Sequence, residues 1–313
     1  MTNKNYLQSF LLATLLPAAS GFAVVGLSVL CFREYGIVLF VLLPIYIGFI
    51  SAALYGKDTM SRILATTAFA LLFTGISLMA FALEGAVCLA MAFPLALVLA
   101  FGGSLLGTLT WKVKAKPARF LPLILLLFTP FLLSFESSKK SAPTVHKVVS
   151  TVEINAPIET VWQNVIAFPQ IETAPEGILR LGFAYPVNAR IEGRGVGAIR
   201  YCNFNTGAFV EPVTAWQEPH LLAFDVKEQP APMIETSFYQ NLQTPHLDYI
   251  KSERGQFRLY EKDGATVVEG TTFYTHDIAP DFYWNLFSEE IIHQIHLRVL
   301  NHIKKVSENQ AKN

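Results

Sequence analysis

The sequence has 313 residues, which leaves room for two domains or for one domain and a membrane region. Apolar residues make up 52% of the chain and charged residues only 15%, far from the composition of an ordinary soluble protein. Residues 1–120 are sparsely charged and basic, with eight Lys/Arg and three Asp/Glu, whereas residues 141–313 are acidic, with fourteen and twenty. Neither part carries the basic stripe that nucleic-acid binding requires, so nucleic acid is excluded as a partner.

The first 136 residues contain five apolar runs, and crossing a bilayer takes about 20 such residues. The runs occupy residues 10–32, 35–55, 63–83, 86–110 and 119–135. The fifth run is short and contains Pro122 and Pro130, so it either spans a locally thinned bilayer or re-enters it. A transmembrane region of about five helices is therefore predicted for residues 1–136.

The positive charges predict the orientation of these spans, because Lys and Arg collect in cytoplasmic loops. In a five-span layout only Arg33 lies in a loop between spans on one side. The other side holds Lys4, Lys57, Arg62, Lys112, Lys114, Lys116 and Arg119. The N-terminus is thus predicted to be cytoplasmic and the C-terminal domain to be periplasmic or otherwise extracytoplasmic. With four spans, that domain is cytoplasmic instead.

Three smaller features bear on the membrane region. Gly103 and Gly107 have the small-xxx-small spacing that lets two helices approach closely, although ordinary packing also accounts for it. Cys31 and Cys88 fall near span ends on one side, where either a disulfide or two buried thiols is consistent. No ionisable residue lies in mid-span, so this region is interpreted as an anchor or lipid-facing platform and not as a pump.

After a polar linker at 137–147, the periodicity changes to that of an α+β domain at 148–307, followed by a tail at 308–313. Residues 145–154 alternate as a strand, and a short helix follows Pro157. Turn residues then separate six further strands, predicted at 183–192, 197–204, 208–216, 221–227, 255–261 and 266–276. A longer insertion at 228–250 is of the kind that often covers a site.

The last element is a long amphipathic helix from Asp281 to about Ser307, with an apolar stripe that must pack on a sheet. A strand, a short helix, six strands and a terminal helix together describe a helix-grip fold, in which an antiparallel sheet curves around the long C-terminal helix. The predicted fold class is therefore an α+β helix-grip domain fused to an N-terminal all-α transmembrane bundle.

The residues VEINAPIETVW at 152–162, with Phe168 and Pro169 after them, resemble the opening of the SRPBCC superfamily. That group includes START-like lipid-binding domains, pollen-allergen-like carriers and polyketide cyclase/dehydrase-like proteins. Residues 216–226 and 270–274 further resemble bacterial members attached to membranes. The resemblance covers about residues 145–307 and implies an apolar cavity between sheet and terminal helix. It implies no reaction, because no catalytic motif matches, and no cofactor is predicted.

Several polar residues are candidates for contacts inside such a cavity. Arg200 and Glu211 lie in neighbouring predicted strands, where they hold a ligand headgroup, form a structural ion pair or lie on the surface. His246, in the insertion with Tyr239, is either a lid residue or general base or a loop histidine without a role. The candidate ligand-binding residues are Arg200, Glu211, His246, Tyr274 and Trp284.

The terminal helix carries further polar residues. His293 and His296 have a spacing that metal ligands can have, but the helical projection places them away from the apolar stripe. They are interpreted as solvated surface, and no metal site is predicted. Arg298 and His302 lie nearer the stripe, where they either line a cavity or sit at the edge of the core.

Three functions are consistent with the sequence. The leading hypothesis is a membrane-anchored binding protein for a lipid or other hydrophobic small molecule, with membrane lipids as further partners. The second is a cyclase/dehydrase-like enzyme acting on an apolar substrate, with Glu211 or His246 as acid or base. The third is a structural or sensory membrane protein whose domain binds a partner. The sequence leaves the oligomeric state open.

Overall fold

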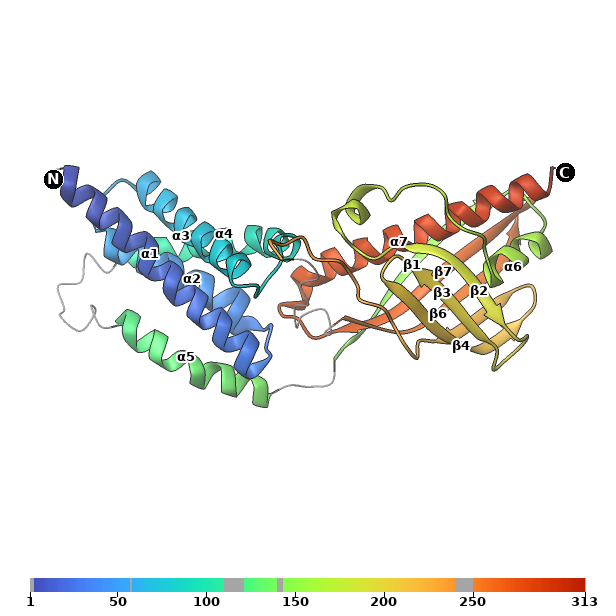
Figure 1. Ribbon diagram of the computed structural model, residues 1–313, viewed down its shortest axis with the longest axis horizontal. Helices are drawn as coiled ribbons and strands as arrows, with labels where there is room; N and C mark the ends of the chain where they lie inside the picture. Colours follow the sequence, from blue (N-terminus) through green and yellow to red (C-terminus); the bar gives the residue numbers. More distant parts are fainter. Residues whose placement is uncertain (1–2, 57, 110–120, 140–142, 240–249, 313) are drawn as a thin grey trace. The chain divides into compact units, whose positions relative to one another are not determined.

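The computed structural model describes residues 3–56, 58–109, 121–139, 143–239 and 250–312 (Figure 1). The chain forms two compact units. The first contains Met1–Ala142 together with the short segments Glu235–Pro245 and Ile278–Phe282. The second contains Pro143–Ile234, His246–Asp277 and Tyr283–Asn313.

The first unit is a helical bundle. Its helices are α1 (Asn3–Leu27), α2 (Leu43–Tyr55), α3 (Met60–Ala80), α4 (Ala86–Leu109) and α5 (Leu121–Ser138), with π-helical turns η1 (Ser28–Phe32) and η2 (Val38–Leu42). Within the described residues, four stretches are long and apolar enough to cross a membrane: Leu7–Phe32, Val38–Tyr55, Met60–Ala80 and Ala86–Leu109. The chain therefore has the helices of a multi-pass membrane protein. The fifth predicted run forms α5, which is 18 residues long and is not among these four.

Glycines bring α2 and α4 into close contact. A Cβ atom at Gly48 would lie 1.8 Å from the carbonyl oxygen of Ala100, and one at Gly103 would lie 2.1 Å from that of Ile45. A Cβ at Gly107 would approach the Phe49 carbonyl oxygen to 2.5 Å. The spacing of Gly103 and Gly107 thus marks a real close approach of two helices, which side chains at these positions would prevent.

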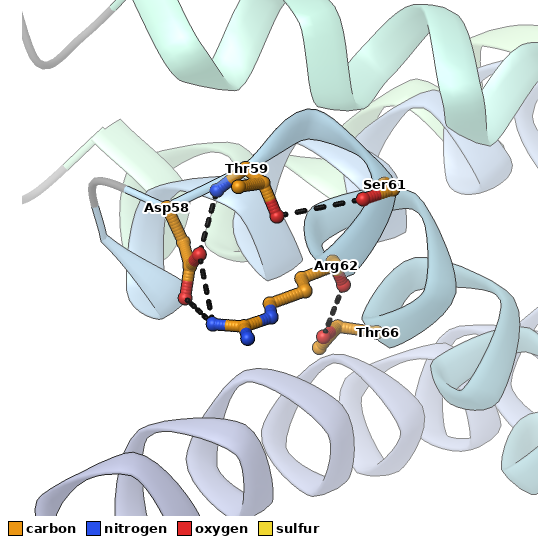
Figure 2. Close-up of polar contacts among 5 residues, drawn as sticks. All are labelled: Asp58, Thr59, Ser61, Arg62 and Thr66. Atoms are coloured by element: carbon orange, nitrogen blue, oxygen red, sulfur yellow. Dashed lines mark hydrogen bonds and ion pairs between the residues drawn. The ribbon is translucent and has the colours of Figure 1, made fainter.

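Polar contacts gather at the ends of the bundle. At the start of α3, Asp58 accepts a hydrogen bond from the backbone N–H of Thr59 and pairs with Arg62 at 3.3 Å (Figure 2). At the opposite ends of α1 and α3, the Tyr35 hydroxyl donates to Glu84 Oε1 at 2.7 Å. Inside the bundle, Thr67 Oγ1 of α3 lies 2.8 Å from Ser104 Oγ of α4, so a buried hydrogen bond also joins two helices away from the ends.

Helix α5 runs along this bundle. Its Leu133 is completely buried, and Glu136 near its C-terminal end accepts hydrogen bonds from the backbone N–H groups of Ile37 (2.6 Å) and Val38 (3.3 Å). The C-terminal end of α5 therefore lies beside the connection between α1 and α2.

Two segments from the second half of the sequence belong to this helical unit. The backbone N–H of Ala86 donates to Thr236 O at 2.8 Å, and the Cys88 thiol donates to Glu235 Oε1 at 2.6 Å. The backbone N–H of Ala279 donates to Tyr35 O at 2.9 Å. Part of the insertion predicted at 228–250 therefore packs against membrane helices, a contact that its sequence did not indicate. Cys31 and Cys88 are not joined to each other, so the disulfide considered for them is not formed.

The second unit is built on a seven-stranded antiparallel sheet with the order β1-β7-β6-β5-β4-β3-β2. The strands are β1 (Val145–Ile154), β2 (Pro186–Glu192), β3 (Ile199–Phe204), β4 (Gly207–Gln217), β5 (Leu221–Asp225), β6 (Ile250–Lys262) and β7 (Ala265–His276). The helical elements are α6 (Ile158–Ile166), η5 (Gly177–Leu181) and α7 (Asp281–Gln310). Strand β1 begins inside the stretch predicted as linker, and α7 extends beyond residue 307.

Helix α7 lies along the curved sheet, as Figure 1 shows, and this arrangement is the predicted helix-grip fold. Because side chains alternate between the faces of a strand, every second residue of β1 and β7 faces the helix. The core contains Trp162 of α6, Leu259 of β6 and Leu300 of α7, all with 1% exposure or less. Near Ile154 and Ile303, packed apolar side chains fill the space between helix and sheet.

Candidate functional site

The predicted partners Arg200 and Glu211 face each other across β3 and β4 and form a buried ion pair. Their exposed fractions are 1% and 6%. Arg200 Nε also donates to Ile166 O at 3.2 Å. The two charges therefore compensate each other inside the domain, as buried charges require.

Aromatic rings surround this pair. The Arg200 guanidinium lies 5.5 Å from the ring centroids of both Phe224 and Phe257, and 5.9 Å from that of Phe168. Burial raises the pKa of Glu211, while the positive charge of Arg200 opposes that shift. Burial likewise raises the pKa of the neighbouring Cys202 to about 12, so its thiol stays protonated and unreactive.

The acid–base role considered for Glu211 finds little support in these contacts. A general base must be able to accept a proton from a substrate, and the carboxylate of Glu211 is already held by Arg200. The other acid–base candidate, His246, lies outside the described residues.

Tyr274 and Trp284 lie elsewhere in the domain, near the start of α7. Tyr274 is completely buried on the inner face of β7, and its hydroxyl is 2.8 Å from Ser288 Oγ. Trp284 packs its ring against those of Tyr283 and Phe287. The predicted residues thus form at least two separate groups. Tyr274 and Trp284 lie near the start of α7, whereas the Arg200–Glu211 pair lies beside the rings of Phe224 and Phe257.

The histidines of α7 correct the sequence interpretation, which placed His293 and His296 on a solvated surface. Ser150 Oγ lies 2.7 Å from His293 Nδ1 and 3.0 Å from His296 Nδ1. His296 Nε2 is 2.7 Å from Thr272 Oγ1. The projection failed because it defined the buried side of α7 by apolar residues alone, whereas part of that side is polar.

A second set of polar contacts continues along the same strands. The rings of His146 and His276 stack with centroids 5.0 Å apart and an interplanar angle of 7°. His276 Nε2 is 2.6 Å from Asn285 Oδ1, and Asn285 Nδ2 is 3.4 Å from His146 Nδ1. These contacts extend the polar interior toward the start of α7.

Together these residues form a polar seam between helix and sheet. We define the polar seam as His146, Ser150, Thr272, Tyr274, His276, Asn285, Ser288, His293 and His296. The sequence contained a signal for the polar seam, because His146 and Ser150 have the same strand parity as the buried Val148 and Ile154 and so lie on the same face of β1. Strand parity was therefore a better guide than the helical projection.

Electrostatics keeps the centre of the polar seam neutral. Burial, with a further contribution from His293, lowers the pKa of His296 to about 4. His296 is therefore an uncharged imidazole at neutral pH. Among the described residues, no group of three or more His, Cys, Asp or Glu side chains is arranged to hold a metal ion.

The packing of α7 differs along its length. Ser288 and Val299 are buried, but every residue from Ile291 to Arg298 between them is only half-buried. Beneath the helix, Thr272 and Phe257 on the inner face of the sheet are half-buried as well. About two turns of α7 are therefore packed less tightly on the sheet than the buried positions Ser288 and Val299 on either side.

Arg298 and His302 take the edge position that was one of their two predicted placements. Arg298 donates to the backbone oxygens of Thr173 (2.7 Å) and Pro186 (3.0 Å). His302 Nε2 is 3.1 Å from Pro169 O. These side chains hold the segment between α6 and β2 against α7, and backbone oxygens of that segment accept their hydrogen bonds.

Solved structures with a similar fold cover the second half of the chain. A protein from Nitrosospira multiformis shares 20% identity over 54% of this chain and 100% of its own length, with a TM-score of 0.35. Truncated norcoclaurine synthase from Thalictrum flavum shares 15% identity over 54% of this chain and 96% of its own, with a TM-score of 0.34. The Aha1 dimer from Colwellia psychrerythraea shares 17% identity (52% and 96% covered; TM-score 0.30).

These similarities concern the fold alone. No protein-family model matches the sequence, and a search of curated proteins found no relative.

Proposed function

We propose that this protein is a membrane-anchored binding protein that holds a lipid or another hydrophobic small molecule between the sheet and α7. The observation that carries the proposal is the half-buried stretch Ile291–Arg298, which lies over the half-buried Thr272 and Phe257. A fully packed helix–sheet contact excludes solvent from its facing side chains, whereas a ligand site leaves them accessible.

The chemistry of the interior supports an apolar ligand. The inner face around this stretch includes Phe257 and Val152, and the charged pair Arg200–Glu211 is neutral as a unit. Pockets that are mostly apolar with a few placed polar groups suit lipids and related molecules. Attachment to membrane helices keeps such a domain at the bilayer, which raises the effective concentration of membrane lipids around it.

We further infer that α5 completes a fifth crossing, so that the helix-grip unit lies on the side of the membrane opposite the N-terminus. The hydrogen bonds from the backbone of Ile37 and Val38 to Glu136 support this inference, because they hold the C-terminal end of α5 beside the α1–α2 connection. That connection is separated from the N-terminus by the full length of the first span. With the N-terminus cytoplasmic by its positive charges, the second unit is extracytoplasmic.

The binding function is tested by identifying what co-purifies with the full-length protein. Lipids extracted from the purified wild type are compared by mass spectrometry with those from Thr272→Phe, which fills space under the middle of α7. Thr151→Phe is the matched control, because Thr151 is exposed on the outer face of the sheet. Lipids that bind to the membrane helices should be present in equal amounts in all three proteins, because the substitutions leave those helices unchanged.

The wild type and Thr151→Phe are expected to carry a stoichiometric apolar molecule that Thr272→Phe lacks. Identical lipid profiles for all three proteins, with Thr272→Phe shown to be folded, contradict the proposal.

A further inference from the structure

The interior of the helix-grip unit changes in character along β7. Its inward residues run from Val268 and Gly270 to Thr272, Tyr274 and His276. A Cβ at Gly270 would lie 3.5 Å from Phe257 and 3.7 Å from Leu300, so the first part is lined by apolar side chains. The second part belongs to the polar seam, so the interior has an apolar end and a polar end.

The polar seam contains no Lys, Arg, Asp or Glu side chain. Its members are four histidines, two serines, a threonine, a tyrosine and an asparagine. The burial that lowers the pKa of His296 keeps that ring uncharged. Among the described residues, the one cation with less than 2% exposure is Arg200, which Glu211 already neutralises. A phosphate or carboxylate beside Ser150, Thr272 and His296 would therefore lose its hydration without meeting a Lys or Arg side chain of the polar seam.

The hydrogen bonds of the polar seam can reverse their direction. Ser150 has one hydroxyl hydrogen and contacts both His293 Nδ1 and His296 Nδ1, so it donates to one ring and accepts from the other. The tautomer of His296 in turn decides whether its Nε2 donates to Thr272 or accepts from it. The cluster can therefore present either a donor or an acceptor to a ligand.

From this arrangement we propose that the polar seam, at Ser150, Thr272 and His296, binds the uncharged hydroxyl or carbonyl end of the ligand. The hydrocarbon part lies toward Phe257 and Leu300. The ligand class is thus a neutral lipid, such as an acylglycerol or a long-chain alcohol, and not an anionic phospholipid or a fatty-acid anion. The inference rests on the proposed function, whose ligand it specifies.

A photoreactive monoacylglycerol, with a diazirine in its acyl chain, tests this on the full-length protein in lipid nanodiscs. Peptide mass spectrometry locates the cross-links. Displacement is then compared for unlabelled monoacylglycerol and for lysophosphatidate with the same acyl chain, which differ in the phosphate group.

Cross-links are expected on peptides from β1, β7 or α7, and monoacylglycerol is expected to displace the probe at concentrations about tenfold lower than lysophosphatidate. The double variant Ser150→Ala/Thr272→Val should lose most of that preference. Ser307→Ala should keep it, because Ser307 is a buried serine of α7 that bonds Asn164 outside the polar seam.

The outcomes separate the two proposals. Cross-links on these elements with equal displacement by both lipids, or with a preference for lysophosphatidate, overturn the assignment of the polar seam and leave the binding function standing. Labelling that never falls on these elements also overturns the assignment of a neutral lipid, whereas the binding function is contradicted only by identical co-purified lipids in the wild type and Thr272→Phe. Because the two lipids are compared on the unaltered protein, the preference for the neutral lipid is tested even if the double variant does not fold.

Discussion

At the residue scale, two buried polar groupings share the helix-grip interior but differ in their electrostatics. The Arg200–Glu211 pair concentrates two opposite charges that depend on each other, whereas the polar seam distributes hydrogen bonds among side chains that include no Lys, Arg, Asp or Glu. Removing one member is therefore expected to have different consequences in the two places, because an unpaired buried charge costs far more than an unpaired hydroxyl.

Breaking the ion pair from one side should destabilise the helix-grip unit strongly. Glu211→Gln leaves Arg200 buried without its counter-charge, and Arg200→Met leaves Glu211 buried without its own. Each substitution should lower the free energy of unfolding by about 3–5 kcal/mol. The double variant Arg200→Met/Glu211→Leu should recover most of that loss. Thermal or denaturant unfolding measures all three. Single variants that each cost less than about 1 kcal/mol would show that the pair is solvated or not formed.

His296 should make stability depend on pH in one defined window. Its pKa is about 4 in the folded protein against an unperturbed value of 6.5, so the unfolded chain binds the proton more readily. Stability should therefore be highest above pH 6.5, fall as the pH drops toward 4, and change no further from this group below that. The loss attributable to it is at most about 3 kcal/mol.

Unfolding of the full-length protein between pH 7 and pH 4 tests this dependence. His296→Gln should flatten the part of the slope that this histidine contributes, whereas His302→Gln, at the edge of α7, should retain it. An unchanged slope in His296→Gln would mean that the ring is charged or solvated in the folded state.

At the scale of elements, strand alternation and turn residues predicted much of the fold. The strand predicted at 266–276 is β7 (Ala265–His276), and that predicted at 197–204 is β3 (Ile199–Phe204). Strand β6 begins at Ile250, five residues before its prediction, because Ile250–Arg254 extend the pairing with β7 although the segment lacks a clean alternation. Pairing with a neighbour, which a single sequence does not display, decided that boundary.

The candidate site was less predictable than the fold. The Arg200–Glu211 pair follows from the register of two adjacent strands, which short turns fix. The polar seam depends instead on how α7 is rotated over β1 and β7, and a stripe drawn from apolar residues misplaced His293 and His296. Helix rotation on a sheet is set by the sum of packing contacts, so polar side chains that join a core escape a hydrophobicity projection.

The contact between α2 and α4 gives a prediction with a neighbouring control. Gly103→Ala places a Cβ against the Ile45 backbone and should destabilise the bundle by about 1–3 kcal/mol. Gly102→Ala, one residue earlier, meets nothing within 4 Å and should be neutral or stabilising by up to about 1 kcal/mol, because Ala favours helix. Thermal unfolding in detergent compares them. Equal effects of the two substitutions would mean that the helices do not approach closely at Gly103.

At the scale of the whole molecule, the proposed topology depends on α5. Glu136, near the C-terminal end of α5, accepts hydrogen bonds from the connection between α1 and α2, so we expect a reporter fused at the C-terminus to lie on the side of the membrane opposite the N-terminus. Paired reporters that are active only in the cytoplasm or only outside it, fused at each terminus, measure this. Both termini reporting the same side would reduce α5 to a re-entrant segment and place the helix-grip unit in the cytoplasm.

The central claim is that the middle of α7 covers a bound apolar molecule and not a solid core. An experimental density map of the full-length protein purified in native lipids tests this most directly. Continuous elongated density is expected between Ile291–Arg298 and the inner face of the sheet, with one end near Thr272. Side chains that close this space completely, with no such density, would contradict the account.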